Sequence, residues 1–245
     1  MPLELTFLGT GNAFAPTRYW SSFLLNDRYL FDAPPTLLPH LKKLKKDAGE
    51  IDVIFISHFH GDHFFGLPFL LLEYAEMHPR SKDLTIVGPP GVAKRARTIT
   101  DQAFSNVFRK DRGYDLTFVE VHDGATGEVA GCRWTACEVV HVPNLECFGY
   151  RVDCGQGTVA YSGDTSLCDA LVPLADGADV FVAECSCWDE RCGAIHLTPK
   201  NIDHLRKHIS PSTKFILTHI GAGEAPAFLA DAGVLIADDL KTIRV

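Results

Sequence analysis

Short apolar runs, separated by Gly, Pro, Asn and Asp, alternate along the chain with segments of helical periodicity. The apolar runs predict strands, because turn-forming residues bound each of them. Strands are expected over 3–8, 22–25, 29–32, 51–57, 84–87, 116–121, 133–140, 148–153, 158–162, 180–184 and 215–218. The run at 51–57 is continuously apolar, which predicts a strand buried on both faces.

Six further segments place apolar residues on one face of a helix. Helices are expected over 35–46, 67–76, 93–108, 167–175, 199–208 and 225–232. Thr198 is the expected N-cap of 199–208, and Pro199 stands at its first position. Strands followed by helices occur in both halves of the chain. We therefore predict an α+β fold of two β/α halves, a four-layer αββα sandwich with the sheets packed together and the helices outside.

Composition adds few constraints to this picture. The chain has 245 residues, of which 46% are hydrophobic and 22% charged, as in ordinary globular proteins. No linker-like segment divides it, so residues 1–245 are expected to form a single domain. The first residues lack a secretory signal, and no apolar run approaches the ~20 residues of a membrane span. We therefore expect a cytoplasmic protein without a membrane partner, whose eight cysteines are reduced.

Charge and histidine content bear on function. The formal net charge of −8 argues against a broad nucleic-acid-binding face, although it leaves room for a small basic patch. Eleven histidines are present, and they become significant only if several converge.

The sequence His58-Phe59-His60-Gly61-Asp62-His63 follows the buried strand expected at 51–57. Three imidazoles and a carboxylate within six residues are typical of a metal site. A helix would turn His58 and His60 about 200° apart, so they can share one centre only in a turn. A histidine-rich surface turn is the alternative interpretation.

Three more polar residues follow expected strands, where loops display functional groups on a rigid scaffold. They are His141, Asp164 and His219. With the motif at 58–63 they make seven candidate ligands, too many for one tetrahedral zinc and suitable for two metals.

With these motifs the chain resembles the metallo-β-lactamase-fold hydrolase superfamily over nearly its whole length, from Gly9-Thr10-Gly11 to His219. The resemblance implies the metallo-β-lactamase fold, a first metal on His58, His60 and His141, a second on Asp62, His63 and His219, and Asp164 bridging both. It implies two divalent ions, with zinc expected first and manganese or iron as alternatives.

Glu184 ends an expected strand, and His196-Leu197-Thr198 precedes the next helix. These features resemble the phosphodiesterase branch, which includes ribonuclease Z and the phosphoribosyl cyclic phosphodiesterase of phosphonate breakdown. There the residue matching His196 lies beside the scissile phosphate and that matching Glu184 orients it. A simple helix-start residue is the alternative for His196.

Ribonuclease Z carries a long arm that grips transfer RNA, inserted after the histidine matching His141. Only 22 residues separate His141 from Asp164, and two expected strands largely fill them. The missing arm and the charge of −8 favour a small anionic phosphodiester over nucleic acid.

The expected function is therefore a dinuclear metal-dependent phosphodiesterase acting on a small or cyclic phosphodiester through a metal-bridging hydroxide. Asp62 is also expected to orient the hydroxide, and His196, held by Glu184, to protonate or stabilise the leaving oxygen. Alternatives are tRNA 3′ processing of the ribonuclease Z type, thioester, lactone or β-lactam hydrolysis on the same metals, and a sensor without turnover. The sequence leaves a homodimer open.

Two further features of the sequence, a glycine-rich segment and a cluster of cysteines, are each open to more than one interpretation. Gly9-Thr10-Gly11-Asn12 either lines the site or forms a tight turn. Cys185, Cys187 and Cys192 could form a structural zinc site or a redox-sensitive patch, but their C-x-C-x4-C spacing favours unreactive thiols.

Overall fold

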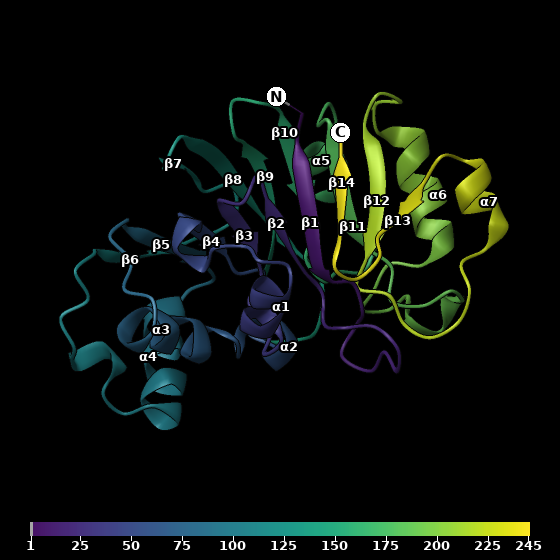
Figure 1. Ribbon diagram of the computed structural model, residues 1–245. Helices are drawn as coiled ribbons and strands as arrows, with labels where there is room; N and C mark the ends of the chain where they lie inside the picture. Colours follow the sequence, from purple (N-terminus) through teal and green to yellow (C-terminus); the bar gives the residue numbers. More distant parts are fainter. Residues whose placement is uncertain (1) are drawn as a thin grey trace.

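The computed structural model describes residues 2–245 and contains two seven-stranded sheets (Figure 1). The first sheet has the order β14-β1-β2-β3-β4-β5-β6. Its strands are β1 (Glu4–Gly9), β2 (Ser22–Leu25), β3 (Tyr29–Phe31), β4 (Val53–Phe55), β5 (Leu84–Gly88), β6 (Leu116–Glu120) and β14 (Lys241–Arg244).

The second sheet has the order β13-β12-β11-β10-β9-β8-β7. Its strands are β7 (Thr126–Val129), β8 (Cys132–Val139), β9 (Cys147–Asp153), β10 (Thr158–Tyr161), β11 (Val180–Glu184), β12 (Lys214–Thr218) and β13 (Leu235–Ile236). Counted from β14 in the first sheet and from β7 in the second, three antiparallel strand pairs are followed by three parallel pairs. The two halves therefore share one architecture.

An aromatic core fills the space between the sheets. Phe23 stacks on Phe31 at 4.4 Å between ring centroids, and Tyr161 meets both rings edge-on. Buried aromatic pairs of this kind contribute to stability beyond the area they bury. The Tyr150 hydroxyl crosses the interface to donate to the Ile56 carbonyl at 2.8 Å, which fixes one sheet against the other beside the metal motif.

Helices cover both outer faces (Figure 1). The first sheet carries α1 (Leu37–Lys43), α3 (Leu67–Glu76) and α4 (Val92–Ala103), and their apolar sides form a second core with it. The second sheet carries α5 (Leu171–Ala175), α6 (Pro199–His208) and α7 (Ala227–Asp231) over a third core. Short helical turns are α2 (Gly61–Phe64), η1 (Ala48–Glu50), η2 (Val107–Arg109) and η3 (Glu190–Cys192). The predicted αββα sandwich is confirmed.

Several element predictions need correction. The C-terminal strand β14 was not predicted, and it pairs with β1 in the first sheet, so the chain ends beside its beginning. The strands β7 and β13 were also missed, because β7 is largely polar and β13 has only two residues. The helix expected at 93–108 ends at Ala103, and Phe104 is extended. In residues 2–245 no helix is long and apolar enough to cross a membrane.

Candidate metal centre

The loop after β4 presents the first histidines. His60 has extended backbone angles (φ −64°, ψ 149°) immediately before α2, whereas Asp62 and His63 lie in that short helix. His58 and His60 therefore lie outside the helix, in the loop before it. This agrees with the prediction from their spacing, because a helix would point the two rings in different directions. His60 Nδ1 lies 3.0 Å from His58 Nε2, so both rings point toward one place.

The structure brings all seven predicted side chains together in two groups. Potential ligand atoms lie within 4.8 Å of one another in each group. The first contains His58, His60, His141 and Asp164, and the second contains Asp62, His63 and His219.

Asp164 lies between the groups. Its Oδ2 atom is 3.2 Å from His219 Nε2 and 3.4 Å from His63 Nε2, which belong to the second group. The same atom is 3.9 Å from the Nε2 atoms of His58 and His141 in the first group. Gly163 allows this placement, because its φ is +60° and a Cβ there would lie 2.8 Å from the Phe148 carbonyl oxygen.

Hydrogen bonds at Nδ1 assign the tautomers of the ligand histidines. His63 Nδ1 donates to Asp32 Oδ2 at 2.7 Å, and His141 Nδ1 donates to the Ile195 carbonyl at 2.8 Å. A carboxylate and a carbonyl only accept, so in the neutral form of either ring Nδ1 carries the proton and Nε2 presents a lone pair.

Two hydroxyl groups orient the rings of His58 and His219 in the same way. Ser57 Oγ donates to Asp32 Oδ2 at 2.8 Å and accepts from His58 Nδ1 at 2.9 Å. Ser186 Oγ donates to the His219 carbonyl at 3.1 Å and accepts from His219 Nδ1 at 2.7 Å. Nε2 of both rings is therefore also free to bind a metal.

These lone pairs fit a divalent cation. The Nε2 atoms of His63 and His219 are 3.3 Å apart, so without a proton or a cation between them their two lone pairs would repel each other. Asp164 Oδ1 is buried and has no hydrogen-bond partner within residues 2–245, which is costly for a carboxylate oxygen. A cation bound between these atoms would remove both penalties, and imidazole and carboxylate donors suit zinc, manganese or iron.

Electrostatics favour the form that a metal requires at some donors and oppose it at His63. Burial acts to lower the pKa of His63, but Asp164 and Asp32 outweigh it and raise that pKa well above its usual value, so a bound cation would displace a proton from this ring. Burial and the neighbouring His63 lower the pKa of His58 well below its usual value, so its imidazole is neutral. For Asp62 and Asp164, burial acts to raise the pKa, but His63 and His219 outweigh it and hold both pKa values far below the usual range. Both carboxylates therefore remain ionised.

Asp32 is a buried site residue that sequence reasoning missed. Its carboxylate accepts from Ser57, His63 and the Tyr161 hydroxyl, the last at 2.7 Å. Its φ of +59° is unusual for a residue other than glycine, which often marks a functional position. A signal was present in the sequence, since an acidic residue directly follows the apolar strand β3.

Glu184 and His196 form the predicted pair. His196 Nδ1 donates to Glu184 Oε1 at 2.6 Å, which leaves Nε2 for the neighbouring cavity. Glu184 is fully buried at the end of β11 and also accepts the Thr165 backbone N–H at 2.9 Å. Burial acts to lower the pKa of His196, but the hydrogen bond and charge of Glu184 raise it above its usual value.

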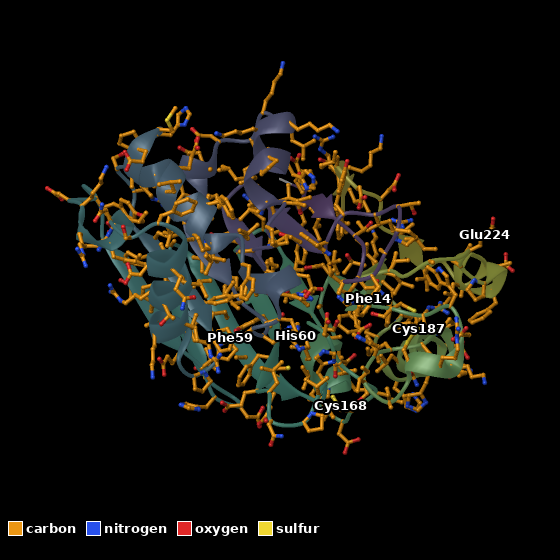
Figure 2. All side chains as sticks on the ribbon, turned by 90° about the horizontal axis from the view of Figure 1, so that it is seen from below. Phe14, Phe59, His60, Cys168, Cys187 and Glu224 are labelled. Atoms are coloured by element: carbon orange, nitrogen blue, oxygen red, sulfur yellow. A yellow bond between two sulfur atoms is a disulfide. The ribbon has the colours of Figure 1, made fainter. Side chains whose placement is uncertain are left out.

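A cavity of about 360 Å³ opens over this cluster. His60, Asp62 and His196 line it together with Phe14, whose side chain is 91% exposed. In Figure 2 His60 lies between Phe59 and Phe14 on this face. The cavity has the size of a small-molecule site.

The Gly9–Asn12 segment forms a turn and also lines the site. The Ile220 N–H donates to the Thr10 carbonyl at 2.7 Å, and the Asn12 N–H donates to the Ile220 carbonyl at 3.1 Å. The loop thereby holds the backbone that follows His219. Asn12 also lines the cavity, so the two interpretations are compatible.

The cysteine cluster differs from expectation. Cys187 and Cys192 form a disulfide, so the prediction of reduced thiols is wrong for this pair. Their Cα atoms are 6.1 Å apart, a separation that a disulfide can bridge. The Cys192 carbonyl accepts the backbone N–H groups of Ile195 and His196, so this loop supports the site. The other cysteines are free, namely Cys132, Cys137, Cys147, Cys154, Cys168 and Cys185.

Sequence comparisons identify relatives of the chain. Ribonuclease Z of Methanosarcina mazei is 26% identical over 302 aligned positions, which cover 99% of this chain and 98% of the relative. Ribonuclease Z of Staphylococcus carnosus is 35% identical over 163 positions, which cover 62% of this chain and 49% of the relative. The chain therefore matches only about half the length of the second protein.

Solved structures share the fold. The human short-form tRNase Z superposes with a TM-score of 0.77 at 25% identity, and the superposition covers 98% of this chain and 98% of the human protein. A diphosphatase from the PhnP family gives a TM-score of 0.76 at 20% identity, over 99% of this chain and 98% of the other. The family model described as beta-lactamase superfamily domain matches residues 27–220. With this match over most of its length, the chain belongs to the beta-lactamase superfamily and is a hydrolase of the metallo-β-lactamase fold.

Proposed function

We propose that the protein is a metal-dependent phosphodiesterase acting on a small or cyclic phosphodiester. The observation that carries this proposal is the Glu184–His196 pair beside the metal-ligand cluster. Hydrolysis of an ester or lactam at a metal centre does not require a second, carboxylate-held imidazole, whereas a phosphodiester has an alkoxide leaving group that benefits from a proton donor.

The proposed ligand set has two parts that share one residue. His58, His60 and His141 would hold a first ion, Asp62, His63 and His219 would hold a second, and Asp164 lies where it could serve both. Zinc is the first candidate, with manganese or iron as alternatives. When bound, divalent ions polarise phosphoryl oxygens and lower the pKa of water at such a site.

The protein's own side chains then orient the reaction. Asp62, whose carboxylate remains ionised, accepts a hydrogen bond from the attacking hydroxide, which forms when water gives up one proton to solvent, and directs its lone pair toward phosphorus. His196 donates the proton on Nε2 to the departing oxygen, while Glu184 holds Nδ1 and stabilises the imidazolium. The raised pKa of His196 favours the protonated ring that this step needs.

The substrate is proposed to be small because the chain lacks an arm at the expected place. Only residues 140–146 join β8 to β9, immediately after the strand that leads to His141. The alignment with the Methanosarcina mazei ribonuclease Z spans 302 positions, so that relative contains segments absent from these 245 residues. A net charge of −8 also disfavours a long RNA footprint.

RNA 3′ processing is the second candidate function. It is favoured by the names of the relatives, several of which are called ribonuclease Z or ribonuclease BN. The two candidates use the same side chains and differ only in what surrounds the scissile bond.

A substrate panel on protein of measured metal content tests the proposal. We expect turnover of a chromogenic phosphodiester and little turnover of a thioester, a lactone or a β-lactam. His196→Ala should lower kcat by about 10²–10⁴-fold for a phosphodiester with an alkoxide leaving group, with metal content unchanged, and by much less for the chromogenic ester, whose phenolate departs without a proton.

His204→Ala is the matched control, because His204 is exposed on α6, belongs to none of the ligand groups and does not line the cavity. Unchanged turnover of the alkoxide-leaving phosphodiester in His196→Ala with two metals per chain would overturn the role of His196. Turnover of the thioester or lactone alone would overturn the proposed function.

A further inference from the structure

A second cavity of about 520 Å³ adjoins the metal-centre cavity and has no part in the chemistry described above. The segment 58–65 separates the two. Its residues His60, Gly61 and Asp62 line the metal-centre cavity, whereas Phe59 and Phe65 line the second one. Figure 2 shows Phe59 and His60 beside each other on this face. A ligand in the second cavity would therefore lie next to the proposed scissile bond.

Aromatic rings form one wall of this second cavity. Phe65 is 49% exposed although it is a large apolar side chain. Its ring packs over Gly61, where a Cβ would lie 3.0 Å from the ring. Phe65 thus stands at the boundary between the cavities and offers an aromatic face to a planar ligand.

Cations form a second wall of this cavity. Lys94 and Arg95 of α4 line the cavity, and the Arg95 guanidinium lies 4.7 Å from the centroid of the Phe59 ring. Within residues 2–245 no carboxylate lies within 4.0 Å of either cationic group. Their charges are therefore available to an anionic ligand.

This positive charge is unusual for the chain. The segment 92–112 contains six basic residues and two acidic ones, whereas the whole chain has a net charge of −8. The basic residues are Lys94, Arg95, Arg97, Arg109, Lys110 and Arg112. Positive charge is thus concentrated on one helix and the turn after it, and two of these residues, Lys94 and Arg95, line the second cavity.

We propose that this second cavity binds a nucleotide unit of the substrate, with the base stacked on Phe65 and a second phosphate near Lys94. This inference rests on the proposed phosphodiesterase function and names its substrate class, a phosphodiester of a nucleoside. An apolar ligand would not need the unpaired cations, and a lone phosphate would not need the exposed aromatic ring. Only a ligand that is both planar and anionic uses both walls.

Three chromogenic substrates with one leaving group separate these contributions. They are methyl p-nitrophenyl phosphate, thymidine 5′-(p-nitrophenyl phosphate), and the latter compound with a 3′-phosphate. We expect kcat/KM to rise in that order for the metal-loaded protein. Phe65→Ala should reduce the advantage of the nucleoside over the methyl ester about tenfold. Lys94→Ala should remove most of the advantage of the 3′-phosphate.

Matched variants control for general damage. Phe69→Ala removes an equally exposed ring that packs on Phe104 outside the cavity. Arg97→Ala removes a cation from the same helix whose guanidinium lies over Phe108. Both controls should keep the wild-type ratios, and equal losses in controls and test variants would overturn the proposal.

A binding measurement gives a readout independent of turnover. Titration calorimetry with thymidine 3′,5′-bisphosphate should show binding that weakens about tenfold in Phe65→Ala and in Lys94→Ala. Competition by a single-stranded RNA octamer would identify the nucleotide as the end of a strand, and competition by the free nucleotide alone would identify a small substrate. Both results support the cavity as a nucleotide site.

The two proposals fail differently. If the wild-type protein hydrolyses the methyl ester and the nucleoside ester equally well and does not bind the bisphosphate, the nucleotide site is wrong and the phosphodiesterase stands. If neither ester is hydrolysed by metal-loaded protein while the bisphosphate binds, the proposed function is wrong and the site stands.

Discussion

The two halves of the molecule build the candidate metal centre in different ways, although their sheets share one architecture. The first half contributes His58, His60, Asp62 and His63 from the single loop and short helix after β4. The second half contributes one side chain from each of several strand ends, namely His141 after β8, Asp164 after β10 and His219 after β12.

The supporting hydrogen bonds differ in the same manner. In the first half one carboxylate, Asp32, holds both the His63 ring and the hydroxyl that holds His58. In the second half each histidine has a separate partner, such as Ser186 for His219. The first half therefore depends on one buried group, whereas the second distributes its support over several.

The largest effect is expected where the halves meet. Asp164→Ala removes the carboxylate that lies near ligand atoms of both groups. We expect metal affinity to fall by more than the ~100-fold typical of an outer partner, and turnover to be lost. Metal analysis after gel filtration measures the change. Two tightly held ions in this variant would show that the halves bind metal independently.

A smaller loss of metal affinity is expected when the supporting hydrogen bonds are changed, and its size should differ between the shared Asp32 carboxylate of the first half and the separate partners of the second half. Asp32→Asn replaces an acceptor of several hydrogen bonds by a group that also donates, so one or more donors lose their partner. We expect metal affinity to fall about 10–100-fold, with a loss in the free energy of unfolding of about 1–3 kcal/mol.

Ser186→Ala is the matched change in the second half. It removes the partner of the His219 ring and of the His219 carbonyl, touches no other histidine, and should affect metal affinity less than Asp32→Asn does. Calorimetric metal titration and denaturant unfolding compare the variants. Equal losses in both would contradict the view that the first half depends on one shared group.

The smallest effect concerns pH. Burial lowers the pKa of His196, but Glu184 outweighs it and raises the pKa, so the ring keeps its proton to higher pH. Activity that needs this proton is lost as pH rises through the pKa. In Glu184→Gln we expect the alkaline limb of the kcat–pH profile to move to lower pH.

Glu190→Gln is the control for this pH experiment, because it removes a nearby charge whose carboxylate accepts from Thr198 rather than His196. Its alkaline limb should match that of the unmodified protein. If the limb of Glu184→Gln also stays in place, His196 is not the titrating donor.

The sequence by itself determined the αββα architecture and the seven-residue cluster. Periodicity marked the apolar strands and the amphipathic helices, since these patterns reflect burial that each segment needs on its own. The motif at 58–63 was readable for the same reason, because its four candidate ligands lie within one loop. Glu184 and His196 were identified from a family resemblance rather than from spacing.

Only the tertiary structure decided the rest. Asp32 gained its importance from partners as distant in sequence as Tyr161, which local patterns do not encode. The strand β14 has little apolar character and forms only because β1 offers it an edge. The cavity between Phe65 and Lys94 likewise depends on the packing of α4 beside α2. These features arise from contacts between distant segments, whose energies appear only once both segments are in place.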